Sequence, residues 1–416
     1  MTEAVPVAPT TSAPAATSAK KNVMVGTGLF IGAFGLSLAN HGVSTLLQAA
    51  SKSIAPDDPI GFYATLTTFG AVASVLAIVF AGALSDRTRS RFGRRIPWLA
   101  GSGLLGATGL ALAGFGSAGF LVVIGYIAFM MALNASIAAS TAVVPDVVDA
   151  RRLGLISSLM GAGNLIGGVI GGFFAAAYIT RPQTGLSVLP AVFLLTALVM
   201  VVLLPRVSSL GQARTPGGIR GFLRSFELPK GGQFWWVFTG RFLFALALFM
   251  TVMYAFFVAT GYLGLGTQKA GDLLAVCTLV MSVGSVAAAL LTGPVSDRIG
   301  RKPFVIGAPI LIAAGAVPLI LTAQPWALIA FYGPGGIAFG AYLAVDAALM
   351  VDVLPDRSRA AQDLAILQAA NSLPLVVAPS IAGVLTRIGG FEASFVGTVV
   401  AGLAAALCIL RVKGIR

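Results

Sequence analysis

Long apolar runs, one after another along almost the whole chain, limit most strongly what this sequence can fold into. A helix needs about 20 residues to cross the hydrocarbon core of a bilayer. The sequence contains twelve such runs, at about residues 24–48, 60–84, 96–114, 119–143, 154–178, 187–205, 236–262, 271–295, 303–321, 326–350, 362–386 and 391–410. A transmembrane β-barrel would show segments of about 10 residues with alternating polarity instead. We therefore expect an all-α membrane protein with twelve transmembrane helices.

The composition argues against a water-soluble fold. Of the 416 residues, 57% are hydrophobic and only 10% are charged, whereas soluble domains carry about 25% charged residues. Glycine is frequent, with 51 residues, and small residues let membrane helices pack closely. Cys277 and Cys408 lie in apolar runs and are expected to be buried thiols. A soluble enzyme or a nucleic-acid-binding protein is therefore a poor interpretation, in spite of the formal net charge of +13.

The basic residues indicate which loops face the cytoplasm, because Lys and Arg are enriched in cytoplasmic loops. With the N-terminus inside, 22 of the 27 Lys and Arg residues fall on cytoplasmic segments and 4 on outer segments, and Arg241 lies within a span. We expect both termini on the cytoplasmic side of the cell membrane. The expected order along the chain is a disordered cytoplasmic tail (1–22), an N-terminal six-helix half (23–205), a cytoplasmic linker (206–234), a C-terminal six-helix half (235–410) and a cytoplasmic tail (411–416).

The two halves of the sequence repeat one motif. Residues 82–87 (Gly-Ala-Leu-Ser-Asp-Arg) and 293–298 (Gly-Pro-Val-Ser-Asp-Arg) are 211 residues apart, and each run continues to a glycine followed by two basic residues. Asp146 and Asp352, after the fourth and tenth spans, repeat at an offset of 206. Near-equal offsets indicate one six-helix unit used twice. Two such pseudo-repeats around a central cavity are a transporter architecture.

The repeated motif resembles the cytoplasmic signature of the major facilitator superfamily, which lies between spans two and three and again between spans eight and nine. The first copy carries four extra residues. This extended form (85–98), together with the stretch 346–374, resembles the glycoside–pentoside–hexuronide cation symporters and the related sucrose/proton symporters. The resemblance implies a carrier that works by alternating access, in which the two halves rock around a central site.

The resemblance also implies a gate, in which motif residues hold the cytoplasmic ends of the halves together while the carrier faces outward. A carboxylate at such a helix end can accept backbone N–H groups and pair with nearby arginines. Exposed pairs contribute only about 0–1 kcal/mol each, so this gate could break and reform. The alternative is that the basic residues only fix the topology. The expected gating residues are Asp86, Arg87, Gly93, Arg94, Arg95, Asp146, Asp297, Arg298, Gly300, Arg301, Lys302 and Asp352.

Three ionisable residues inside spans are candidates for proton coupling, because charges at membrane depth are costly and tend to mark function. Arg241 in span seven and Asp346 in span ten lie at similar depths, and by the resemblance both spans line the central cavity. We expect the two side chains to face each other, so that a proton on Asp346 would break the pair. A purely structural ion pair is the alternative. His41, the single histidine, is the third candidate, with a packing role as its alternative.

Polar and aromatic residues on the expected cavity spans could contact a substrate, since a sugar needs fixed hydrogen-bond partners and an aromatic face. The candidates are Asn40, Gln48, Asn134, Tyr254, Tyr342 and Asn371. Each could instead bridge helices. The run 333–336 (Gly-Pro-Gly-Gly) predicts a kink or break in span ten, where exposed backbone could bind or hinge, with a kink that serves packing alone as the alternative.

We expect a secondary active transporter that takes up a sugar or glycoside together with a proton or another cation. A proton-driven exporter of drugs or metabolites would have a similar sequence, and a non-transporting membrane sensor or assembly factor is a third interpretation. No Walker loop is present, and one histidine with two cysteines cannot build a metal cluster. We therefore expect no enzyme activity, cofactor, metal site or nucleic-acid partner. The expected partners are a small-molecule substrate, the coupling ion and the bilayer, and the expected state is a monomer.

Overall fold

The computed structural model describes residues 19–85, 88–116, 118–148, 153–206, 231–352 and 360–412, and in this part of the chain all regular secondary structure is helical, with no strand. Eleven helices in it are long and apolar enough to cross a membrane. The last of them, α13 (Ala360–Leu410), contains two spans, because its backbone leaves the helical conformation at Gly389 and Gly390. The expected fold class, an all-α protein with twelve transmembrane helices, is therefore confirmed.

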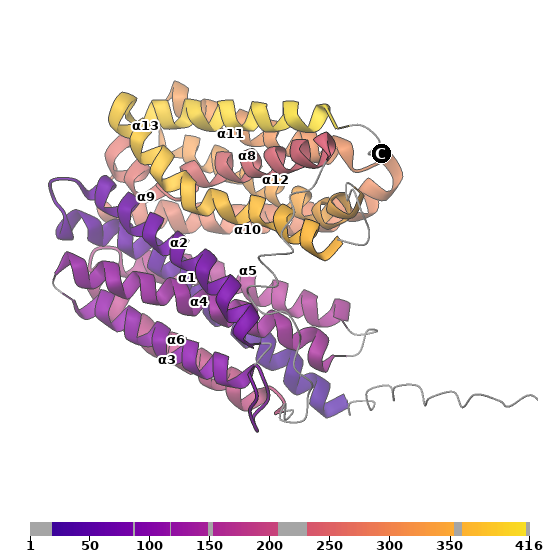
Figure 1. Ribbon diagram of the computed structural model, residues 1–416. Coiled ribbons are helices and arrows are strands. Elements are labelled where there is room, and N and C mark those ends of the chain that lie inside the picture. The colour runs from indigo at the N-terminus through magenta and orange to yellow at the C-terminus, as the bar shows by residue number, and fades with distance from the viewer. Residues whose placement is uncertain are drawn as a thin grey trace, which may run out of the picture.

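The helices form two bundles that follow one another in the sequence (Figure 1). The N-terminal half comprises α1 (Ala19–Ile54), α2 (Pro59–Ser85), α3 (Ile96–Phe115), α4 (Gly119–Val147), α5 (Leu153–Tyr178) and α6 (Pro182–Leu203). The C-terminal half comprises α8 (Gly232–Val252), α9 (Ala255–Phe257), the π-helix η2 (Val258–Tyr262), α10 (Thr267–Ile299), α11 (Lys302–Leu321), α12 (Pro325–Asp352) and α13.

The two halves repeat the same packing. In the N-terminal half, α1 packs on α5 and α6, α2 on α4, and α3 on α4 and α6. In the C-terminal half, α8 packs on α13, α10 on α12, and α11 on α12 and α13. Even the motif glycines match, since Gly93 and Gly300 both have φ of 91°. The six-helix unit inferred from the sequence offsets is thus visible in the packing of the helices.

Some element boundaries differ from the expected ones. The seventh span, expected as one run over 236–262, is divided into α8, α9 and η2. The first helix begins at Ala19, inside the segment expected as a tail, and α8 begins at Gly232, inside the expected linker. The rest of the tail (1–18), most of the linker (207–230) and the last four residues (413–416) lie outside the described residues.

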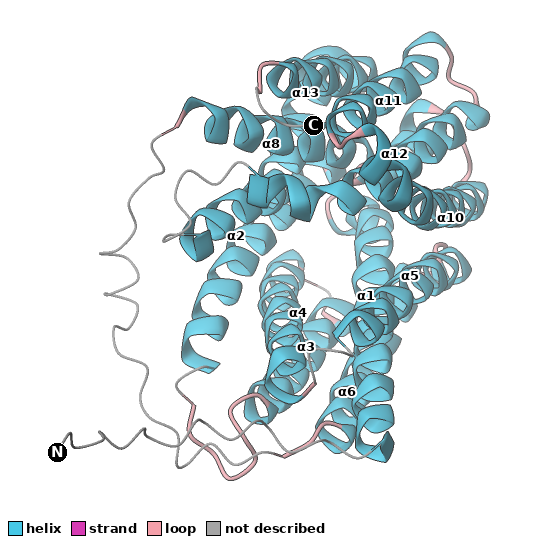
Figure 2. Ribbon diagram, turned by 90° about the vertical axis from the view of Figure 1, so that its right-hand side faces the viewer, coloured by secondary structure: helices cyan, strands magenta, loops and turns pink. Residues whose placement is uncertain are grey.

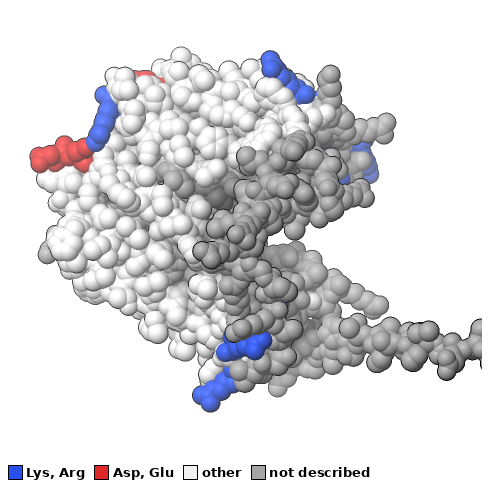
Figure 3. Space-filling model, viewed as in Figure 1, with Lys and Arg blue, Asp and Glu red and all other residues white. Residues whose placement is uncertain are grey.

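The surface carries large apolar side chains along the helices. Leu195, Leu290 and Leu407 are 60%, 71% and 62% exposed, which in water would be an aggregation hazard and in a bilayer is contact with lipid. On the face drawn in Figure 3, the charged residues of the described part lie near the ends of the helices, and the white surface between them carries no Lys, Arg, Asp or Glu. The fold is therefore that of a multi-pass membrane protein.

The halves are together at one end and apart at the other. At the left of Figure 1 the start of α2 lies against α13, whereas at the right, toward the described ends of the chain, the two bundles diverge. Figure 2 looks from the open end. The halves touch mainly through α1 with α9, α2 with α13, and α5 with α10. The molecule is therefore open on the side of the repeated motif and closed on the opposite side.

Candidate transport site and gates

A buried ion pair joins α8 to α12 in the C-terminal half. The Nη1 group of Arg241 donates to Oδ1 of Asp346. The Arg241 side chain is completely buried and Asp346 is 5% exposed. The structure thus brings together the two ionisable residues that were expected to face each other. Burying two charges costs several kcal/mol each unless they are paired, so each residue depends on the other.

An aromatic stack covers this ion pair on the same two helices. Tyr342, one turn before Asp346 on α12, stacks on Phe244 of α8 with ring centroids 4.0 Å apart and planes 12° from parallel. Tyr342 is only 2% exposed, and its hydroxyl has no hydrogen-bond partner among the described residues. The residue was expected to line the cavity, and the structure places it inside the C-terminal half beside the charges.

A cavity of about 360 Å³ lies in the N-terminal half, between α1, α4 and α5. Two candidate residues line it, Asn40 and His41, and so does Asn164 of α5. The Nδ1 atom of His41 lies 3.0 Å from the carbonyl oxygen of Ser37. The N-terminal half therefore presents a polar site that is separate from the ion pair of the C-terminal half.

Asn134, a candidate substrate contact, forms hydrogen bonds within the N-terminal half. Its side-chain amide donates to Oγ of Ser74 on α2 at 2.9 Å and to the carbonyl oxygen of Met130 at 2.9 Å. It therefore ties α4 to α2 within the N-terminal half, which is the structural alternative for a polar residue in a membrane helix.

Gln48 and Tyr254, also expected as substrate contacts, lie where the halves meet. Oε1 of Gln48 accepts the backbone N–H of Phe256 at 3.1 Å, which belongs to the turn after the break in α8. Tyr254 packs edge-on against Tyr63 of α2, with ring centroids 5.9 Å apart, and its hydroxyl donates to the carbonyl oxygen of Pro379 at 2.7 Å. Both residues therefore help to close the molecule.

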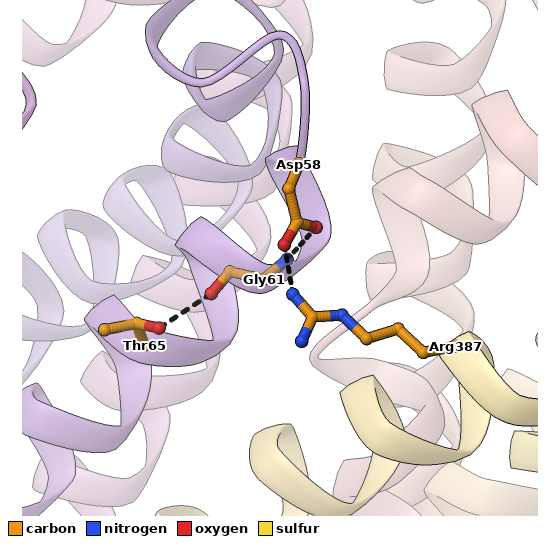
Figure 4. A network of polar contacts seen from close by, with 4 residues as sticks. All are labelled: Asp58, Gly61, Thr65 and Arg387. Atoms are coloured by element: carbon orange, nitrogen blue, oxygen red, sulfur yellow. Dashed lines mark hydrogen bonds and ion pairs between the residues drawn. The ribbon is translucent and has the colours of Figure 1, made fainter.

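Two further contacts between the halves complete this closed end, and sequence reasoning missed them. The hydroxyls of Thr68 on α2 and Ser380 on α13 are 2.6 Å apart. At the rim, Arg387 forms an ion pair with Asp58, whose other oxygen accepts the N–H of Gly61 at 2.9 Å at the start of α2 (Figure 4). The signal in the sequence was one Arg and one Asp on expected outer segments of opposite halves.

We call these contacts the outer gate, because this end faces outward in the orientation expected from the basic residues. It consists of Gln48, Asp58, Thr68, Tyr254, Ser380 and Arg387.

At the open end, only part of the motif is described. Arg95 donates to Oγ of Ser85 at 2.8 Å, Lys302 donates to the carbonyl oxygen of Val412 at 2.7 Å, and Arg298 is exposed. Residues Asp86 and Arg87, and the side chains of Asp146, Asp297, Asp352 and Asn371, lie outside the described residues. The described side-chain contacts of Arg95 and Lys302 join groups within one half each, which agrees with halves that have moved apart.

Comparison with known proteins identifies the family. The family model for the Major Facilitator Superfamily matches residues 24–288 and 276–414. The chain belongs to this superfamily. No curated protein matches the sequence. Membership indicates a membrane transporter of a small molecule and not an enzyme.

Solved structures of transporters share the fold. The nucleoside transporter NupG has a TM-score of 0.75 at 15% identity, with 94% of this chain and 100% of that chain covered. A bacterial homolog of the human lysosomal transporter Spinster, inward-facing and occupied, has a TM-score of 0.74 at 13% identity, with 95% and 98% covered. A D-xylose-proton symporter has a TM-score of 0.68 at 17% identity, with 95% and 98% covered.

Proposed function

We propose that the protein is a proton-coupled carrier that takes up a small sugar or glycoside across the cell membrane by alternating access. The observation that carries this proposal is the buried ion pair between Arg241 and Asp346. A membrane helix pair does not need two buried charges for its packing, and charges at this depth are typical of ion and proton pathways. The pair links α8 to α12, so a change in its charge acts on the arrangement of the C-terminal half.

The pair can respond to a single proton. When Asp346 is ionised, its carboxylate balances the Arg241 guanidinium. When Asp346 takes up a proton, its attraction for the guanidinium falls and the buried charge of Arg241 becomes more costly, which favours a state in which water or substrate reaches it. Proton binding thereby shifts the balance between the two arrangements of the halves.

The structural relatives and the motif support the choice of substrate. One similar structure is named a D-xylose-proton symporter and another a nucleoside transporter, and the extended motif resembles the glycoside–pentoside–hexuronide symporters. We further propose a monomer with both termini in the cytoplasm, so that the open end faces inward. The motif residues at that end would close the cytoplasmic gate in the outward-facing state.

Transport in proteoliposomes tests this function. We expect sugar uptake driven by an imposed inward proton gradient, with accumulation that an uncoupler abolishes. Asp346→Asn should abolish accumulation, because the amide cannot gain a proton. Asp272→Asn is the matched control, since Asp272 is an exposed carboxylate at the start of α10 whose Oδ1 accepts from Gln268 at 3.0 Å.

A folding control is needed, because removal of one partner from a buried pair costs about 3–5 kcal/mol. The double variant Arg241→Gln/Asp346→Asn removes both charges and should recover the melting temperature without recovering accumulation. Gradient-driven movement of drugs without any sugar transport would contradict the proposal and favour the exporter. Full accumulation by Asp346→Asn would exclude this residue as the proton carrier.

A further inference from the structure

The cavity of the N-terminal half is lined by uncharged groups. Among the described residues around it, none carries a carboxylate, an ammonium or a guanidinium group. The polar side chains there are Ser37, Asn40, His41, Ser140, Thr141 and Asn164. A cation or an anion that entered this cavity would lose its water without gaining an opposite charge.

Three of these side chains, Ser140, Thr141 and His41, offer acceptors, because their polar hydrogens are already donated to backbone carbonyl oxygens. The hydroxyl of Ser140 donates to the carbonyl oxygen of Ile137 at 3.0 Å, and the hydroxyl of Thr141 donates to the same oxygen at 2.8 Å. The lone pairs of both oxygens remain available. The amides of Asn40 and Asn164 make no side-chain hydrogen bond within the described residues, so they can supply donors as well as acceptors.

His41 also offers an acceptor, because its one hydrogen on nitrogen is donated to the backbone. Its Nδ1 lies 3.0 Å from the Ser37 carbonyl oxygen, which can only accept, so Nδ1 carries the hydrogen. In the uncharged ring, Nε2 is then the acceptor. The His41 side chain is exposed and lines the cavity.

Helix α5 fixes the position of this ring. A Cβ atom on Gly168 would lie 3.2 Å from Cε1 and 3.4 Å from Nδ1 of His41, and one on Gly171 would lie 3.2 Å from its Cβ. The glycines therefore leave just enough space for the ring, and any side chain at position 168 would push it.

We propose that this cavity binds a neutral solute rich in hydroxyl groups, and that Nε2 of His41 accepts a hydrogen bond from one of those hydroxyls. The inference rests on the proposed transport function and names the chemistry of its substrate. A volume of about 360 Å³ lies near the lower limit for ligand sites, which fits a small sugar, glycoside or nucleoside better than a drug-sized cation. His41 is then a substrate-binding residue, and the coupling proton belongs to Asp346.

Counterflow exchange in proteoliposomes without a proton gradient tests the proposal. The probes are radiolabelled glucose, sucrose, uridine and tetraphenylphosphonium. We expect saturable exchange of at least one neutral solute and none of the cation. His41→Phe keeps a ring without an acceptor and should raise the half-saturating concentration about tenfold or more. His41→Gln places an amide oxygen near the position of Nε2 and should stay within about threefold of the wild type.

Gly168→Ala provides a second test that leaves His41 itself unchanged. The added methyl group should displace the ring and weaken exchange in the same direction as His41→Phe. Gly101→Ala is the matched control, because a Cβ there meets nothing within 4 Å. If His41→Phe fails to fold, as judged by gel filtration, the comparison of Gly168→Ala with Gly101→Ala tests whether exchange depends on the His41 ring.

The outcomes separate this proposal from the proton-coupling proposal. Exchange that depends on His41, in a protein that does not accumulate solute under a proton gradient, supports the binding site and overturns the coupling. Accumulation that is unchanged in His41→Phe supports the coupling and overturns the binding site. Exchange of tetraphenylphosphonium, or of none of the neutral solutes, would overturn the assignment of the cavity.

Discussion

At the scale of single residues, two buried tyrosines illustrate why polarity alone does not predict a role. Tyr254 and Tyr342 are both 2% exposed, and the sequence marked both as substrate contacts. The structure gives the Tyr254 hydroxyl a partner, the carbonyl oxygen of Pro379 at 2.7 Å, and leaves the Tyr342 hydroxyl without one. Tyrosine and asparagine side chains can line a cavity, bridge two helices or remain without a hydrogen-bond partner. Residue type alone therefore could not predict which of these places each candidate takes.

For these two tyrosines we predict that removal of the hydroxyl changes the free energy of unfolding in opposite directions. Tyr342→Phe removes a buried hydroxyl that has no partner and should raise the free energy of unfolding by about 1 kcal/mol. Tyr254→Phe removes a hydroxyl that is bonded and should lower it by about 1 kcal/mol. Melting temperatures of the purified variants in detergent measure both effects. A loss of stability in Tyr342→Phe would mean that its hydroxyl is bonded in the dominant state.

At the scale of elements, the existence of the helices was predictable and the places where they break were not. The sequence indicated one span over 236–262, but α8 ends at Val252 and the chain continues through α9 and η2. Gln48, from the other half of the chain, accepts the Phe256 N–H just after this break. A backbone group in the membrane needs such a partner, and local patterns do not reveal partners that are distant in sequence.

The glycine run in α12 shows the converse. Residues 333–336 suggested a break, yet the helix continues from Pro325 to Asp352. A Cβ on Gly336 would lie 2.3 Å from the carbonyl oxygen of Met281 on α10. The glycines of this run therefore permit close packing of α12 on α10.

Two glycines of α12 should respond differently to substitution. Gly340→Ala would place its Cβ 1.9 Å from the Ser285 carbonyl oxygen, and such overpacking costs about 1–3 kcal/mol. Gly333→Ala meets only Val280 at 3.6 Å and should be neutral or stabilising, because alanine favours helix by about 1 kcal/mol. Thermal unfolding compares the two, and equal effects would contradict the packing of α10 on α12.

At the scale of the whole molecule, the repeat in the sequence predicted two six-helix halves, and the packing of the halves agrees with it. Which end is closed could not be predicted. Alternating access requires two arrangements of similar free energy, so one sequence encodes both. The repeated motif marked residues at the open end of the molecule. The outer gate at the other end includes Asp58 and Arg387, which belong to no motif.

The closed state of the outer gate can be trapped. In a variant that lacks Cys277 and Cys408, we expect Thr68→Cys/Ser380→Cys to form a disulfide under mild oxidation, because the native hydroxyls are 2.6 Å apart. The cross-link should stop transport, and a reductant should restore it, as measured by solute uptake and by loss of maleimide labelling. The single-cysteine variants should stay active under oxidant. Unchanged transport in the cross-linked protein would mean that α2 and α13 need not separate.

Two ion pairs in the described part of the chain differ in their contact with the medium, and this difference has a consequence. The side chains of Arg387 and Asp58 are 59% and 52% exposed, whereas those of Arg241 and Asp346 are 0% and 7% exposed. Dissolved salt screens exposed charges strongly and buried ones much less. For the proton-coupled carrier proposed above, a saline environment should therefore loosen the outer gate and speed the return of the empty carrier to the outside, while the number of protons that accompany each solute stays the same.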